Sequence, residues 1–179
     1  MATKLPETVA GTAADTFDPV VALASGGYTA TATFTAAAAA YLGNDIVDVA
    51  KQMSWVDKNG VLFPGGELLI TTAEMLIAET ALQSGETSYS LKKYSATPPS
   101  ARADNAAWDL AAGDRAAWQG STDLGTPVDI GSSLYIKTTQ INEQITVPAT
   151  GKTFAELVTA GGATLTATTR TVVLHATVI

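Results

Sequence analysis

The feature that most constrains this chain is a set of short segments in which β-branched residues, mainly threonine, recur at every second position. Residues 28–35 (YTATATFT) carry threonine at alternate positions, and residues 171–178 (TVVLHATV) alternate in a similar way. A period of two sends successive side chains to opposite faces of a strand, and β-branched residues suit a half-buried sheet. The pattern therefore predicts strands and disfavours amphipathic helices.

Turn signals separate these segments every ~8–15 residues. The strongest is Asn59-Gly60 between two apolar runs, which predicts a hairpin. Residues 67–82 look strand-like in their first half and helix-like in their second, and we favour one long strand with a bulge. Eight to ten such strands predict an all-β fold, a β-sandwich or jelly roll.

Two alanine-rich segments interrupt the strand pattern, at residues 104–108 and 110–118. Each begins or continues with an aspartate, Asp104 or Asp114, which is a favoured helix cap. We therefore expect one or two short helical turns there. Residues 1–18 lack periodicity and are interpreted as an arm or flexible tail, which leaves residues 19–179 as a single β-sandwich domain.

The amino-acid composition argues against several classes of function. The net charge is -7 and only 15% of the residues are charged, which argues against a nucleic-acid partner. The chain has no cysteine and one histidine, which rules out thiolate chemistry and argues against a multi-histidine metal centre. With no apolar signal region and no run of 18 apolar residues, neither a signal peptide nor a membrane partner is expected. We expect no cofactor.

The remaining polar candidates each have a plain structural interpretation. Asp45 and Asp48 near Gly43 and Asn44 could supply calcium oxygens, but the spacing of a calcium loop is missing, so we favour a turn that opens a strand. His175 is expected to be a partly exposed strand residue.

A second set of candidates lies between residues 94 and 118. Asp104, Asp109 and Asp114 recur every five residues and could include the carboxylate pair of a glycosidase, although caps and solvated turns are the favoured interpretation. Three aromatic residues in the same stretch could form a sugar-stacking platform or could be core anchors. They are Tyr94, Trp108 and Trp118.

The order of several motifs along the chain carries a family resemblance. YLGNDIV at 41–47 is followed by Gly65-Gly66 before a strand, then by LKKY at 91–94, DNAAW at 104–108 and LVTAGGA at 157–163. Over about residues 41–163 this order resembles that of small proteins encoded beside the major capsid gene of tailed bacteriophages. Tyr94-Ser95 departs from the Leu-Phe of that pattern, and the segment after Gly162 lacks its Tyr-Thr-Pro.

The resemblance implies a non-enzymatic decoration (cement) protein that stabilises the phage head. Such a protein binds the major capsid protein on the outer surface of the virion after assembly in the host cytoplasm, usually as a homotrimer at three-fold or quasi-three-fold positions. We expect the rigid proline-containing loops, together with two tryptophans, to make the partner contacts. These candidate contact residues are Pro98, Pro99, Trp108, Trp118, Thr126 and Pro127.

Two other functions stay open at this point. The first is a virion-surface receptor- or carbohydrate-binding module, such as a fibre head, which would need Trp108, Trp118 or Tyr94 exposed. The second is a hydrolase that uses Asp104, Asp109 or Asp114.

Overall fold

The computed structural model describes residues 27–98, 100 and 102–179. The expected arm at 1–18 lies outside these residues. Within them, no helix is long and apolar enough to cross a membrane.

The described chain is almost entirely β-structure, which confirms the predicted fold class. Strands of 2–14 residues alternate with turns, and a single 3₁₀ turn occupies Ala112–Asp114. The strands are β1 (Gly27–Thr35), β2 (Ala40–Tyr41), β3 (Ile46–Ser54), β4 (Gly66–Ile77), β5 (Tyr89–Tyr94), β6 (Trp118–Gly125), β7 (Val128–Asp129), β8 (Leu134–Val147), β9 (Lys152–Thr159), β10 (Ala163–Thr164) and β11 (Thr169–Val178).

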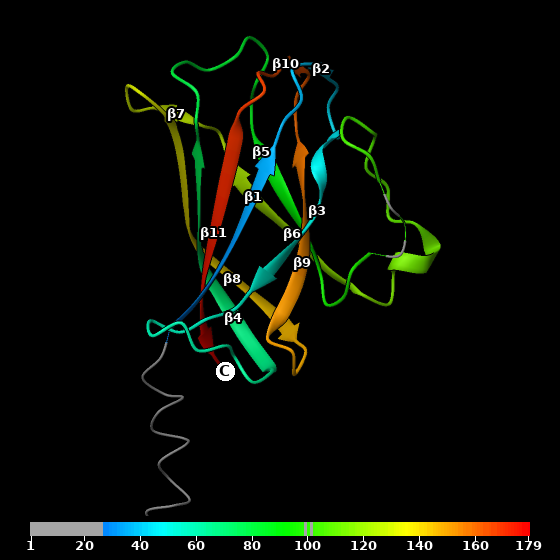
Figure 1. The fold of residues 1–179 in the computed structure, drawn as a ribbon, viewed down its shortest axis with the longest axis vertical. Coiled ribbons are helices and arrows are strands. Elements are labelled where there is room, and N and C mark those ends of the chain that lie inside the picture. Colours follow the sequence, from blue (N-terminus) through cyan, green and yellow to red (C-terminus); the bar gives the residue numbers. More distant parts are fainter. Residues whose placement is uncertain (1–26, 99, 101) are drawn as a thin grey trace, which may run out of the picture.

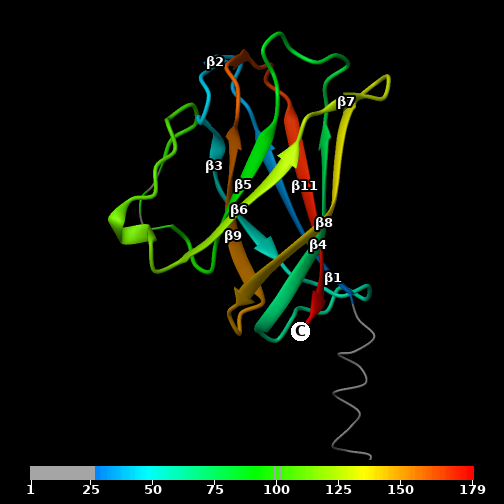
Figure 2. The ribbon, with the colours of Figure 1, turned by 180° about the vertical axis from the view of Figure 1, so that it is seen from behind.

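Two antiparallel sheets form a sandwich (Figures 1 and 2). The larger has the order β1-β11-β4-β8-β7 and the smaller β3-β9-β5-β6, while β10 and β2 form a separate two-stranded pair. The C-terminal strand β11 lies between β1 and β4, with Gly27 opposite Thr177. The first and last described strands are therefore direct neighbours.

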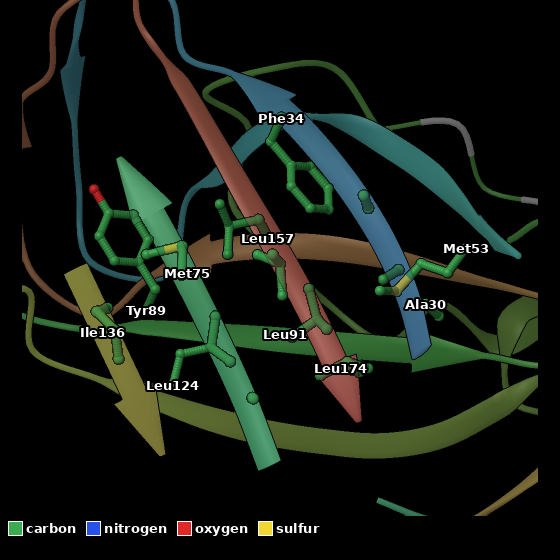
Figure 3. Close-up of a cluster of buried hydrophobic side chains, with 14 of the residues drawn as sticks. Ala30, Phe34, Met53, Met75, Tyr89, Leu91, Leu124, Ile136, Leu157 and Leu174 are labelled. Carbon is green, nitrogen blue, oxygen red and sulfur yellow. The ribbon is translucent and has the colours of Figure 1, made fainter. Parts of the chain in front are cut away.

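The core lies between the two sheets, as Figure 3 shows for side chains of both. Met75 and Leu174 of the larger sheet face Leu91 and Leu157 of the smaller one, and all four are buried. Each such side chain contributes about 1.5–3 kcal/mol on burial. In β1, Ala and Phe side chains point into this core and threonines point outward, as the period-two pattern predicts.

The ambiguous segment at 67–82 forms one long strand over most of its length. It is β4, whose pairing shifts register between Ile70 and Thr72 opposite β8. The strand with a bulge is therefore confirmed. The helix-like composition is overridden because both neighbouring strands pair with it along its length.

The Asn59-Gly60 turn forms, but the hairpin around it is minimal. Asp57 accepts backbone N–H bonds from Asn59 and Val61 at 2.8 Å each, and Gly60 takes a φ of 80°. Beyond the turn, only an isolated bridge between Val56 and Leu62 joins the two sides.

The helical turn expected at 104–108 is wrong. That segment pairs with the start of β3, with the Ile46 N–H donating to the Ala106 carbonyl and the Asn105 N–H to the Ile46 carbonyl. Five residues cannot repay the cost of nucleating a helix when strand pairing is available. The second turn does form, but Asp114 lies at its end and not at its N-cap.

Candidate docking surface

Part of the outer face of the smaller sheet, around Tyr94 and Glu156, is covered by the chain itself. Residues 95–117, here called the lobe, connect β5 to β6 and project to one side of the sandwich (Figures 1 and 2). Arg102 fastens the lobe to β9: its guanidinium donates to Glu156 at 3.0 Å and to Asp114 at 2.7 Å. Asp114 also accepts the backbone N–H of Ser100 at 3.0 Å. Both carboxylates are buried, so the arginine neutralises charge that the lobe removes from water.

Burial opposes the charge on Arg102, but its hydrogen bond and ion pair with Glu156 outweigh burial and raise the pKa of the guanidinium above its usual value. Burial and a hydrogen bond to Glu156 likewise raise the pKa of the Tyr94 hydroxyl. Arg102 is thus held charged and Tyr94 neutral beside the same carboxylate.

The three candidate aromatic residues meet where the lobe joins the smaller sheet. The Trp108 and Trp118 rings lie 5.4 Å apart, and Trp118 meets Tyr94 edge-on at the same distance. The Trp108 indole N–H donates to Glu156 and to the Tyr94 hydroxyl at 3.1 Å each, and Lys92 lies 4.5 Å from the Trp108 ring centre. Tyr94 is buried, while both tryptophans keep part of their surface exposed.

Two of the three aspartates considered for a hydrolase meet at one cation: Arg102 lies 3.4 Å from the Asp109 carboxylate and 2.7 Å from that of Asp114, while Asp104 bonds other groups. Asp104 accepts the Tyr41 hydroxyl at 2.7 Å and the Asp48 N–H at 2.6 Å, Asp114 pairs with Arg102, and the Asp109 side chain is mostly exposed. In residues 27–98, 100 and 102–179 there is no cluster of three metal-ligating side chains.

The other singled-out aspartates accept backbone N–H groups, in agreement with the turn interpretation. Asp45 accepts from Leu42 at 2.6 Å, and Asp48 accepts from Thr35 and Val49 at 2.8 Å each. Asp48 has a φ of 68° at the irregularity of β3, where a short polar side chain is tolerated.

Sequence reasoning missed a second buried arginine, at the far end of the core from the C-terminus. Arg170 donates to Glu79 at 2.8 Å and to the Tyr89 hydroxyl at 3.0 Å. Burial opposes the ionisation of Glu79, but hydrogen bonds from two threonines and the charge of Arg170 hold its pKa below the usual value. The only signal for Arg102 and Arg170 in the sequence is their rarity: the chain has ten lysines and arginines together.

The outer face of the larger sheet is open in this chain. Its threonines follow β1, with Thr31 and Thr33 exposed, and Glu74 and Lys137 pair with each other at 2.8 Å. His175 on β11 is partly exposed, as predicted, 4.0 Å from Glu74. The lobe lies away from this face, beside β3 (Figures 1 and 2).

An apolar patch lies where this open face reaches β7. Strand pairing places Leu76 opposite Tyr135 and Tyr135 opposite Val128, so the three side chains share the outer face. Val128 and Ile130 are 63% and 59% exposed. Together with Thr126 they border a hollow of about 400 Å³. We call this set the β7 patch: Leu76, Thr126, Val128, Ile130 and Tyr135.

The candidate contact residues are distributed over both regions. Thr126 is exposed in the β7 patch, but Pro127 beside it is buried. Pro98 is buried at the base of the lobe, and Pro99 lies outside the described residues. Because Pro98 and Pro127 are buried, they shape their loops, and the surface that these loops offer comes from their neighbours. The contacts themselves stay a prediction.

Comparisons with known proteins add no name to this surface. No family model matches the chain, and no curated protein matches its sequence.

Proposed function

We propose that this protein is a non-catalytic decoration protein of a tailed-phage head, which docks on the outer capsid surface and ties neighbouring major capsid subunits together. The motif order over residues 41–163 supports the family, and the β7 patch is the observation that carries the docking role. The patch is apolar, contiguous and exposed at one end of the sandwich, and apolar patches of this kind mark interaction surfaces.

The side chains of the patch suit docking because they have little conformational entropy to lose. Val128, Ile130 and Leu76 have few rotamers to lose, whereas a lysine or arginine loses up to ~2 kcal/mol of side-chain entropy when immobilised. When such residues are buried in an interface, the loss of side-chain entropy therefore offsets little of the free energy gained by burying them.

The sandwich beneath the patch is held at both seams between its sheets. At one seam, Thr29 and Val56 exchange two backbone hydrogen bonds of 2.8 and 2.9 Å. At the other, the Thr138 hydroxyl donates to the Leu124 carbonyl at 2.6 Å. A body that does not flex presents its patch preorganised, which lowers the cost of binding.

Assembly as a trimer would multiply a weak contact. Three patches related by a three-fold axis match a three-fold lattice point, and simultaneous engagement raises the affinity far above that of a single patch. Three simultaneous contacts would therefore be enough to keep the protein bound to a capsid shell, even though each subunit contributes only one small apolar patch.

Co-sedimentation with shells assembled from the major capsid protein of the same phage tests the proposal. Val128→Glu and Ile130→Glu place a charge in the patch and should abolish binding or weaken it by about tenfold or more. Val61→Glu and Ile179→Glu are the matched controls. Their exposures of 61% and 60% are close to the 63% and 59% of the targets, and the C-terminus lies at the end of the molecule opposite β7 (Figure 1).

Loss of binding in the patch variants alone supports docking through β7. Equal binding by all four variants refutes it, and so does an absence of wild-type binding to expanded shells. Light scattering after size exclusion measures the oligomer separately, with a mass three times 18.3 kDa expected.

A further inference from the structure

We propose a second binding site, for a neutral saccharide, in a groove at the seam between the lobe and the larger sheet. The groove has a volume of about 530 Å³, within the usual range of small-molecule sites. It lies at the end of the lobe, where β6 begins and β8 ends. Its lining residues are Glu67, Ser95, Ala116, Trp118, Gln119, Gln144, Ile145 and Thr146.

Trp118 supplies the apolar wall of the groove. Tyr94 and Trp108 pack against it, each with its ring centre 5.4 Å away, so the indole is held in one orientation. A pyranose ring has a face of C–H groups that packs on an aromatic ring, and a fixed ring loses little entropy when it is covered.

Other residues that line the groove supply oriented amides and a carboxylate. Glu67 accepts from the Gln144 amide at 3.1 Å and from the Thr146 hydroxyl at 2.8 Å. These hydrogen bonds hold the amide and the carboxylate in fixed orientations. Each can then accept or donate a hydrogen bond in a fixed direction, which suits recognition of hydroxyl groups on adjacent carbons of a sugar ring.

The amide of Gln119 is incompletely bonded. Its Nε2 donates to the Thr146 carbonyl at 2.5 Å, which fixes the orientation, since a flipped amide would set two oxygens against each other. Its Oε1 is then buried without a donor from any residue that the structure describes. An unpaired buried acceptor is uncommon and calls for an explanation. A ligand hydroxyl that draws this side chain toward the groove would provide the missing donor.

The charges of the groove select the class of saccharide. Among the described lining residues there is one carboxylate and no lysine or arginine. The whole chain has a net charge of -7. A phosphorylated or sialylated sugar would be repelled, so the ligand that fits is uncharged and has one apolar face.

Calorimetric titration with maltotriose, cellotriose and tri-N-acetylchitotriose tests the site, and tryptophan fluorescence provides a second readout. We expect at least one of them to bind saturably with a Kd of about 1 mM or tighter, and sialyllactose not to bind. If none of the three neutral trisaccharides binds, the proposal is wrong. Preferential binding of sialyllactose also overturns it.

Variants locate the binding. Gln119→Ala and Trp118→Phe should each weaken the affinity, with about a tenfold loss for the former. Gln52→Ala changes an exposed glutamine on β3 and should leave the affinity for the saccharide unchanged. Unfolding midpoints of all variants show whether a loss reflects the fold. Binding that survives both groove variants would place the sugar elsewhere and refute this site. Because no capsid shell is used, the result is independent of the docking function.

Discussion

The two outer faces of the sandwich differ in what covers them and in the side chains that they present. The lobe covers part of the smaller sheet, with the side chains of Arg102, Asp114 and Glu156 buried between them. The larger sheet presents exposed threonines and the β7 patch on its outer face. The covered face is held by buried charge-assisted hydrogen bonds within the chain, whereas the open face has exposed threonines and a partly exposed ion pair between Glu74 and Lys137.

This difference separates a structural face from an interaction face. Buried charges hold the lobe in one place, because each would be costly to leave unpaired. A charge-poor, rigid face costs little to desolvate and suits a partner. Three substitutions test the contrast, and they are expected to have successively smaller effects on stability.

Arg102→Met should have the largest effect. It leaves the carboxylates of Asp114 and Glu156 buried without their cation, and we expect a loss of about 3–5 kcal/mol in the free energy of unfolding. Urea denaturation measures the loss, and limited proteolysis should show earlier cleavage within residues 95–117.

Arg115→Met is the control, because this arginine lies in the same lobe and is exposed. Its free energy of unfolding should change by less than about 0.5 kcal/mol. If the two variants are equally stable, Arg102 does not hold the lobe.

Tyr94→Phe should have an intermediate effect. It removes a hydroxyl that donates to Glu156 at 2.8 Å and accepts from Trp108 at 3.1 Å, at an expected cost of about 1–3 kcal/mol. Thermal and urea unfolding near neutral pH measure this cost.

The same variant has a signature at alkaline pH. Burial and the Glu156 hydrogen bond raise the folded-state pKa of Tyr94 above its usual value of 10.0. The stability it contributes is therefore complete below that value and is lost as pH rises toward the folded-state pKa. Between about pH 9 and about pH 11, the wild type should lose more unfolding free energy than Tyr94→Phe. If the unfolding free energies of the wild type and of Tyr94→Phe change in parallel over this pH range, the pKa of Tyr94 is not raised in the folded state.

Thr31→Lys on the open face should have the smallest effect. The side chain is exposed on β1, and a change there should shift the free energy of unfolding by less than about 0.5 kcal/mol. Urea denaturation checks this. A loss above about 1 kcal/mol would mean that the open face contributes to the stability of the isolated chain, as the covered face does.

Much of the fold was predictable because strand formation follows local pattern. The alternation at residues 28–35 and 171–178 places threonine outside and apolar residues inside, and both segments are strands. The segment at 104–108 was mispredicted because its alternative to a helix, pairing with β3 near Ile46, involves residues about 60 positions earlier in the chain. Local propensity contains no information about such a partner.

The candidate surfaces show the same division. From the sequence alone follow the all-β class and the small number of charges. The tertiary structure decided that Arg102 faces Glu156, that Leu76, Tyr135 and Val128 share one row, and that Trp118 borders a groove with Gln119. The period of a strand is set by neighbouring residues, but its partners and register are set by the burial of a whole face, which only the assembled sheets define.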